Sequence, residues 1–199
     1  MIVPTILENN TTEIQKKLSL IDKVAQLIQI DLITDIDGLE NLTTETKLQL
    51  HFMIPEVDKY LENKIPNVVS VCTEVETTKD MLLFLTKSRK HGYRAGVSVA
   101  PDTPSEILTS FVRQVDYVQF MTVKVGKQGQ PFEYNVLNKI KSFRAKYPNI
   151  KIHADGGISE KTIALFKGMK IDHFVVGSAI FGSENPVDSY TKLSTYEKL

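Results

Sequence analysis

Short runs of apolar and β-branched residues recur along the chain, and the segments between them place apolar residues at helical spacing. The runs predict strands at residues 2–7, 24–33, 48–54, 67–74, 94–101, 116–123, 150–155 and 172–181. The intervening segments predict helices at 11–22, 56–64, 78–92, 104–115, 133–147 and 162–170, and from residue 187 onward. Strands that alternate with helices form parallel sheets. Eight such units predict an α/β fold, a closed (β/α)8 TIM barrel made by residues 1–199 as one domain, with a doubly wound open sheet as the alternative.

The connection after the second strand departs from this alternation. Residues 34–47 are mostly polar and lack the apolar stripe of an amphipathic helix, and only 19 residues separate Asp31 from His51. We therefore expect a degenerate second crossover between Ile33 and Lys47, without a full helix.

Composition narrows the classes of partner. The 199 residues include 24 Lys and Arg and 24 Asp and Glu, so the formal net charge is zero. Nucleic-acid and membrane partners usually require a basic excess, so neither is predicted, whereas a net charge near zero favours self-association into a homo-oligomer. Cys72 is the single cysteine, and the sequence has neither a secretory leader nor a long apolar span, so we expect a cytoplasmic protein.

Polar residues and glycines gather where the predicted strands end. Asp31, His51 and Asp155 lie at the ends of the second, third and seventh strands. Glycine-containing segments follow the sixth, seventh and eighth strands, at 126–129, 156–157 and 177–178. Each feature alone is more often a helix cap, a structural histidine or a turn. Barrel enzymes, however, carry their chemistry at the carboxyl ends of the strands and commonly bind phosphate after the seventh and eighth, so the joint placement favours a functional site.

Seven motifs follow one another in a specific order. They are VPTIL at 3–7, IQID at 28–31, LHFMI at 50–54, AGVSVAPDTP at 95–104, MTVKVGKQGQPF at 121–132, ADGGI at 154–158 and VGSAIF at 176–181. Together they resemble the motifs of ribulose-phosphate 3-epimerases, phosphate-binding barrels that invert C3 of a pentulose phosphate. The likeness runs nearly end to end.

The resemblance implies roles for individual residues. Asp31 and Asp155 would be the two catalytic acid–base carboxylates, and together with His51 they would hold a divalent metal (Zn, Mn, Fe, Co or Mg), with Gln29 as a weak or absent fourth ligand. The substrate, a sugar phosphate, would be bound by Thr5, His51, Met53, Met121, Gly126, Lys127, Gln128, Gly129, Gly156, Gly157, Gly177 and Ser178. This agrees with the chemistry, because inverting a carbon next to a ketone needs a base on one face and an acid on the other.

Departures from the family pattern leave alternatives open. Gln29 stands where the family has a metal-binding histidine, Cys72 also replaces a histidine, and most of the flap after the second strand is missing. A protein that binds sugar phosphates without turnover is therefore the second hypothesis. Decarboxylation or aldol chemistry is the third, and the absence of lysine from QIDLITD at 29–35, where related decarboxylases carry one, counts against it.

Overall fold

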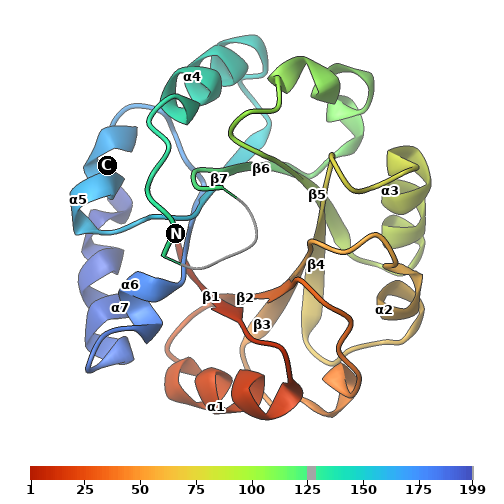
Figure 1. Ribbon diagram of the computed structural model, residues 1–199, viewed down its shortest axis with the longest axis vertical. Helices are drawn as coiled ribbons and strands as arrows, with labels where there is room; N and C mark the ends of the chain where they lie inside the picture. The colour runs from red at the N-terminus through yellow and green to blue at the C-terminus, as the bar shows by residue number, and fades with distance from the viewer. Residues whose placement is uncertain (125–128, 199) are drawn as a thin grey trace.

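The computed structural model describes residues 1–124 and 129–198, and in it eight parallel strands close into a barrel in sequence order, β1 to β8. Figure 1 shows the barrel from one end, with the strands forming the wall of a central ring. The strands are β1 Ile2–Leu7, β2 Leu27–Leu32, β3 Lys47–Phe52, β4 Val68–Glu74, β5 Arg94–Val99, β6 Tyr117–Met121, β7 Lys151–Asp155 and β8 His173–Val176. The barrel prediction is confirmed, and the open-sheet alternative is wrong.

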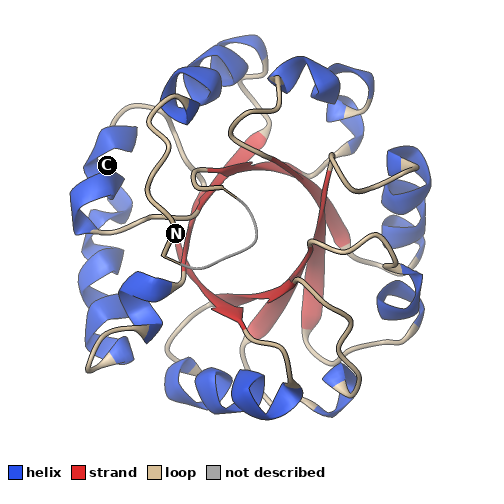
Figure 2. Cartoon of the chain, in the orientation of Figure 1, coloured by secondary structure: helices blue, strands red, loops and turns tan. Residues whose placement is uncertain are grey.

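Helices surround the strands in an outer ring (Figure 2). The α-helices are α1 Thr11–Ile21, α2 Asp58–Glu62, α3 Met81–Lys90, α4 Val136–Lys146, α5 Glu160–Ile163, α6 Ser178–Phe181 and α7 Pro186–Ser194. Shorter 3-10 helices are η1 Leu39–Asn41, η2 Ser105–Ser110, η3 Val112–Gln114, η4 Ala164–Phe166 and η5 Thr195–Lys198. Among the described residues, no helix is both long and apolar enough to cross a membrane.

Alternation along each strand separates the barrel interior from the layer under the helices. In β2, Ile28, Ile30 and Leu32 belong to the main hydrophobic core, whereas Gln29 and Asp31 contact polar side chains of other strands. Every residue of β2 is buried, because a parallel strand is covered on both faces. The interior therefore contains polar groups that must find partners inside the barrel.

Three predicted elements differ in the structure. The segment 104–115 forms η2 and η3 rather than one α-helix, since Phe111 (φ −135°) interrupts it and Thr109 and Ser110 are weak helix formers. The predicted helix 162–170 is replaced by the shorter α5 and η4. The predicted strand 172–181 ends at Val176, because Gly177 (φ −98°, ψ −86°) leaves the extended conformation and starts α6.

The second crossover is reduced as predicted. Its only helix in the described chain is η1, and side-chain hydrogen bonds hold the rest of the segment in place of a helix. Asp22 Oδ1 accepts hydrogen bonds from Thr44 Oγ1 at 2.6 Å and from the Thr46 amide at 3.1 Å. On the other side of η1, the Tyr60 hydroxyl accepts a hydrogen bond from the Ile36 amide at 2.8 Å.

An aromatic stack fills the interior further from the strands' carboxyl ends. The rings of Tyr117 and His153 stack at 4.1 Å, and those of His153 and His173 lie at the same distance. Nδ1 of each histidine is buried without a hydrogen-bond partner. Burial and the neighbouring N-terminal amino group lower the pKa of His173 to about 4, and burial and the other imidazole lower that of His153. Both rings are therefore neutral at pH 7.

We expect this stack to make the fold sensitive to acid. In the unfolded chain a histidine binds a proton below about pH 6.5, whereas in the folded protein it does so only near its lowered pKa. Between these two pH values acid therefore favours the unfolded chain. From pH 7 to pH 5, His173 alone should lower the free energy of unfolding by about 2 kcal/mol. Urea unfolding at both pH values should show a smaller loss for His173→Phe than for wild type. His91→Gln, at an exposed position, is the control and should behave as wild type does.

Candidate active site

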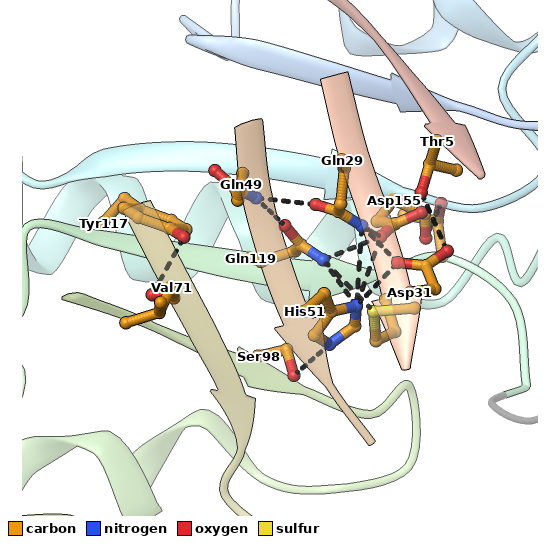
Figure 3. A network of polar contacts seen from close by, with 12 residues as sticks. Thr5, Gln29, Asp31, Gln49, His51, Val71, Ser98, Tyr117, Gln119 and Asp155 are labelled. Carbon is orange, nitrogen blue, oxygen red and sulfur yellow. Dashed lines mark hydrogen bonds and ion pairs between the residues drawn. The ribbon is translucent and has the colours of Figure 1, made fainter. Parts of the chain in front are cut away.

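Three side chains from separate strands converge inside the barrel near the carboxyl ends of the strands. Asp31 comes from β2, His51 from β3 and Asp155 from β7, and one potential ligand atom from each lies within 4.8 Å of the others. His51 Nδ1 is 3.2 Å from Asp31 Oδ1 and 3.8 Å from Asp155 Oδ2 (Figure 3). All three residues are buried. The strand register explains the meeting, because Asp31 pairs directly with His51.

Hydroxyl groups fix two members of this cluster. Thr5 Oγ1 on β1 donates a hydrogen bond to Asp31 Oδ2 at 2.8 Å. Ser98 Oγ on β5 lies 3.0 Å from His51 Nε2. The second contact leaves His51 Nδ1 directed at the carboxylates, which is the arrangement an imidazole needs to bind a cation or to share a proton there.

Two glutamines complete the surroundings of the carboxylates. Gln29 Nε2 donates hydrogen bonds to Asp31 Oδ1 at 2.7 Å and to Asp155 Oδ2 at 2.9 Å. Gln119 Nε2 donates to the same oxygen of Asp155 at 2.7 Å. The Gln29 group that faces the cluster is therefore an amide N–H donor and not a carbonyl oxygen. A role for Gln29 as a fourth metal ligand stays a prediction, and it would require the amide to turn over.

The electrostatics of the cluster favour proton transfer near neutral pH. Burial and the negative charge of Asp31 raise the pKa of Asp155 to about 7. Burial disfavours the charged form of His51, but its hydrogen bond to Asp31 and the charges of both aspartates outweigh this and raise its pKa. A carboxyl group that titrates near pH 7 can both accept and return a proton under physiological conditions.

A pocket opens above the cluster and brings together most of the predicted substrate-binding residues. It is lined by Thr5, Leu7, Asp31, Met53, Met121, Val123, Lys124, Asp155, Gly156, Gly157, Ile158, Gly177 and Ser178. His51 and Gln29 are not among the lining residues, but both contact Asp31 and Asp155, which are. Gly129 is not among the lining residues, and the predicted residues Gly126, Lys127 and Gln128 lie outside the described part of the chain.

The two glycines after Asp155 are explained by the backbone of this pocket. Gly156 has a φ of +105° and Gly157 one of +62°, a region in which side chains are strained. A Cβ atom at Gly156 would lie 2.3 Å from Val123 Cγ2. The Thr122 amide donates a hydrogen bond to the carbonyl oxygen of Asp155 at 2.7 Å, and the Thr122 hydroxyl donates one to the carbonyl oxygen of Gly156. The chain can therefore turn sharply against the β6 loop while Asp155 stays at the end of a rigid strand.

The donor set suits a divalent cation. One imidazole nitrogen and two carboxylate oxygens are the ligands that zinc, iron and manganese sites commonly use. Asp31, His51 and Asp155 are the group among the described residues that meets the spacing for a metal site. Three protein ligands leave positions for water or substrate, as in catalytic metal sites.

Sequence reasoning missed three polar residues around the cluster, Ser98, Gln49 and Gln119. For Gln49 and Gln119 the available signal was the alternation along the strand, because each lies two positions before a candidate residue, His51 and Met121. Ser98 lies on β5, a strand that carried no candidate residue. Their roles depend on which strands face one another across the barrel.

A closed barrel with a buried aspartate–histidine–aspartate group at the carboxyl ends of its strands defines a class: (β/α)8 proteins with a candidate acid–base and metal site. Within this class, the sequence profile of the ribulose-phosphate 3 epimerase family matches residues 2–181. The chain belongs to that family.

Individual relatives agree with this assignment. Ribulose-phosphate 3-epimerase of Schizosaccharomyces pombe is 31% identical over 143 residues, which cover 71% of this chain and 63% of that protein. The cytoplasmic isoform of the Oryza sativa subsp. japonica enzyme is 34% identical over 155 residues, covering 74% of this chain and 68% of that protein. The match to the Eremothecium gossypii protein covers 64% of its length. The matched segment thus spans slightly less than two thirds of the two fungal relatives.

Solved structures share the fold. KGPDC from Streptococcus mutans superposes with a TM-score of 0.78 at 13% identity, over 99% of this chain and 96% of that one. Orotidine 5'-phosphate decarboxylase from Pyrococcus horikoshii gives a TM-score of 0.71 at 14% identity, and both chains are fully covered. At these identities the likeness concerns the barrel alone.

Proposed function

We propose that the protein is an isomerase that inverts C3 of a ketopentose 5-phosphate, interconverting D-ribulose 5-phosphate and D-xylulose 5-phosphate. The observation that carries the proposal is the pair of buried carboxylates, Asp31 and Asp155, which come from separate strands and meet at one imidazole. Family membership supports the same reaction. Epimerisation next to a ketone requires such a pair, one group to remove the proton and another to supply it on the opposite face.

In the proposed mechanism, one aspartate removes the C3 proton and the other delivers a proton to the opposite face. The roles exchange when the reaction runs backward. The Thr5 hydroxyl orients Asp31, and the Gln29 and Gln119 amides orient Asp155. Met53 and Met121 line the pocket with apolar surface, which limits proton exchange between the intermediate and water. A divalent cation held by Asp31, His51 and Asp155 would supply Lewis-acid stabilisation of the developing oxyanion.

The phosphate would bind where the pocket wall is bare backbone, at Gly156, Gly157, Gly177 and Ser178. These residues follow β7 and β8, the strands whose loops commonly bind phosphate in this fold. Lys124 also lines the pocket and adds a positive charge.

We predict that Gly177→Val weakens binding of sugar phosphates by about tenfold or more, because its side chain would enter the space of the phosphate oxygens and lose hydrogen bonds to a charged group. Thermal unfolding checks that the variant folds, since Gly177 has a φ of −98° but a ψ of −86°, outside the usual helical region of L-residues. Calorimetric titration with D-ribulose 5-phosphate measures the effect. Ala164→Val, at an exposed position outside the pocket lining, is the control. Unchanged affinity in Gly177→Val would place the phosphate elsewhere.

A sugar-phosphate-binding protein without turnover is the second candidate. The specific observation in its favour is that the amide of Gln29 donates to both carboxylates, which satisfies these groups without a fourth metal ligand. A coupled assay for formation of D-xylulose 5-phosphate, with elemental analysis of the purified protein, separates the two. Binding without product, with each divalent metal added in turn, would favour this candidate. A single domain of residues 1–199, a homo-oligomer and a cytoplasmic location remain proposals.

A further inference from the structure

Three glutamines occupy the barrel interior beside the acidic cluster. Gln29 lies on β2, Gln49 on β3 and Gln119 on β6, and none of them is more than 1% exposed. Figure 3 shows Gln49 joined to both of the other glutamines, on the side away from the carboxylates. Buried amide groups need hydrogen-bond partners, and each amide has a donor end and an acceptor end. The sense in which these three amides point therefore has chemical consequences.

The carboxylates determine this sense. An ionised carboxylate only accepts hydrogen bonds, so when both aspartates are ionised the groups that face Asp31 and Asp155 must be the NH2 groups of Gln29 and Gln119. Their carbonyl oxygens then point to Gln49, whose Nε2 lies 2.6 Å from Gln29 Oε1 and 3.4 Å from Gln119 Oε1. Gln49 can donate hydrogen bonds to both carbonyl oxygens only if its own NH2 group faces them.

The far end of the network agrees with this assignment. Gln49 Oε1 faces away from the other two amides and accepts a hydrogen bond from Ser70 Oγ at 3.4 Å. The Tyr117 hydroxyl lies 3.0 Å from Ser70 Oγ and 3.2 Å from the Val71 carbonyl oxygen. Because Ser70 has a single hydroxyl hydrogen, it can donate to Gln49 when Tyr117 donates to Ser70. One consistent direction of donation can thus run from Tyr117 through Ser70 and Gln49 to Gln29 and the carboxylates.

From this geometry we infer that Gln49 is a positioning residue that holds Gln29 as a hydrogen-bond donor to Asp31 and Asp155 and keeps its carbonyl oxygen from binding a metal. The amide of Gln29 then competes with a cation for the same carboxylate oxygens. Metal binding at this site rests on three ligands, and its strength is set partly by a residue that touches neither metal nor substrate. The inference rests on the proposed function only in that a cation binds here.

Turning the Gln29 amide would be unfavourable mainly because it breaks the hydrogen bond from Gln49. If the carbonyl of Gln29 swung toward a cation, the cation would replace the two bonds that the amide had donated to the aspartates. The 2.6 Å bond from Gln49 would have no replacement, because the turned amide would present NH2 to the NH2 of Gln49. Removing the donor at position 49 should therefore release Gln29 to act as a ligand.

Gln49→Met tests this directly, since methionine has a similar length, no charge and no N–H donor. Mn²⁺ affinity of chelator-treated protein, measured by calorimetry, should rise about tenfold over wild type, the factor that one net hydrogen bond contributes. The double variant Gln29→Met/Gln49→Met has no amide at position 29 to turn. Its Mn²⁺ affinity should therefore equal that of Gln29→Met, without the tenfold rise. Gln29→Met alone should bind Mn²⁺ at least as tightly as wild type, because it loses a competitor and no ligand.

Two results would overturn the inference. Mn²⁺ affinity in Gln49→Met that does not rise, or that rises equally in the Gln29→Met background, would show that Gln49 does not act through Gln29. A tenfold weaker affinity in Gln29→Met would show that Gln29 is already a ligand. Thermal unfolding checks each variant, and Gln49→Leu, which also lacks an N–H donor, takes the place of Gln49→Met if that variant does not fold. If wild type exchanges no C3 proton while this affinity pattern holds, the proposed function fails and the role of Gln49 stands.

Discussion

Replacing Asp155 by asparagine should lower the rate of proton exchange at C3 by on the order of 10²–10⁴-fold, because an amide can neither accept nor return the proton. The change is nearly isosteric. Gln29 and Gln119 both donate to one oxygen of Asp155, and the asparagine oxygen can take that place. The variant should therefore fold and still bind the ketose phosphate, with the loss confined to turnover.

The measurement pairs the exchange rate with binding of D-ribulose 5-phosphate. Asp37→Asn is the matched control, since that carboxylate is 98% exposed and pairs only with Lys59 among the ion pairs of the described chain. It should exchange at the wild-type rate. An Asp155→Asn protein that keeps more than a tenth of wild-type exchange would remove Asp155 from the chemistry.

Replacing Gln29 by histidine should raise zinc affinity by on the order of 10²-fold, because it adds an imidazole to three ligands that already lie close together and can complete a tetrahedral set. The position is suitable, since Gln29 Nε2 now lies 2.7 Å from Asp31 Oδ1, 2.9 Å from Asp155 Oδ2 and 3.5 Å from His51 Nδ1. To fix the ring, Gln49 would have to turn its carbonyl oxygen toward the N–H of the other ring nitrogen.

Competition with a chromogenic chelator measures the zinc affinity. Gln114→His adds an imidazole at an exposed position and controls for nonspecific binding. Epimerase activity of Gln29→His should rise together with zinc occupancy. Zinc affinity equal to that of the Gln114→His control would mean that the three residues do not form a metal site in the folded protein.

Much of the fold followed from the sequence because local patterns carry it. The alternation of β-branched runs with helical stripes is visible without tertiary information, and so is the lack of a stripe between Ile33 and Lys47. The 3-10 segments η2 and η3 were mistaken for a helix, since their apolar residues have helical spacing while their backbone geometry depends on Phe111.

The candidate site, like the fold, could be predicted from the sequence only in part. Asp31, His51 and Asp155 were identifiable because parallel barrel strands deliver their carboxyl ends to one face, so position in a strand predicts proximity. The contact between Gln49 and Gln119 could not be predicted, because it joins β3 to β6 across the interior and arises only when the barrel closes. The direction of the Gln29 amide depends in turn on Gln49, so it too could not be predicted from the local sequence.

Solvent-deuterium exchange tests the central claim most directly. D-ribulose 5-phosphate incubated with the wild-type protein in D2O should gain one deuterium at C3 and convert in part to D-xylulose 5-phosphate, as NMR would record. The exchange should depend on both Asp31 and Asp155. Wild-type protein that binds the ketose phosphate yet incorporates no deuterium, with or without added divalent metal, would contradict the epimerase proposal.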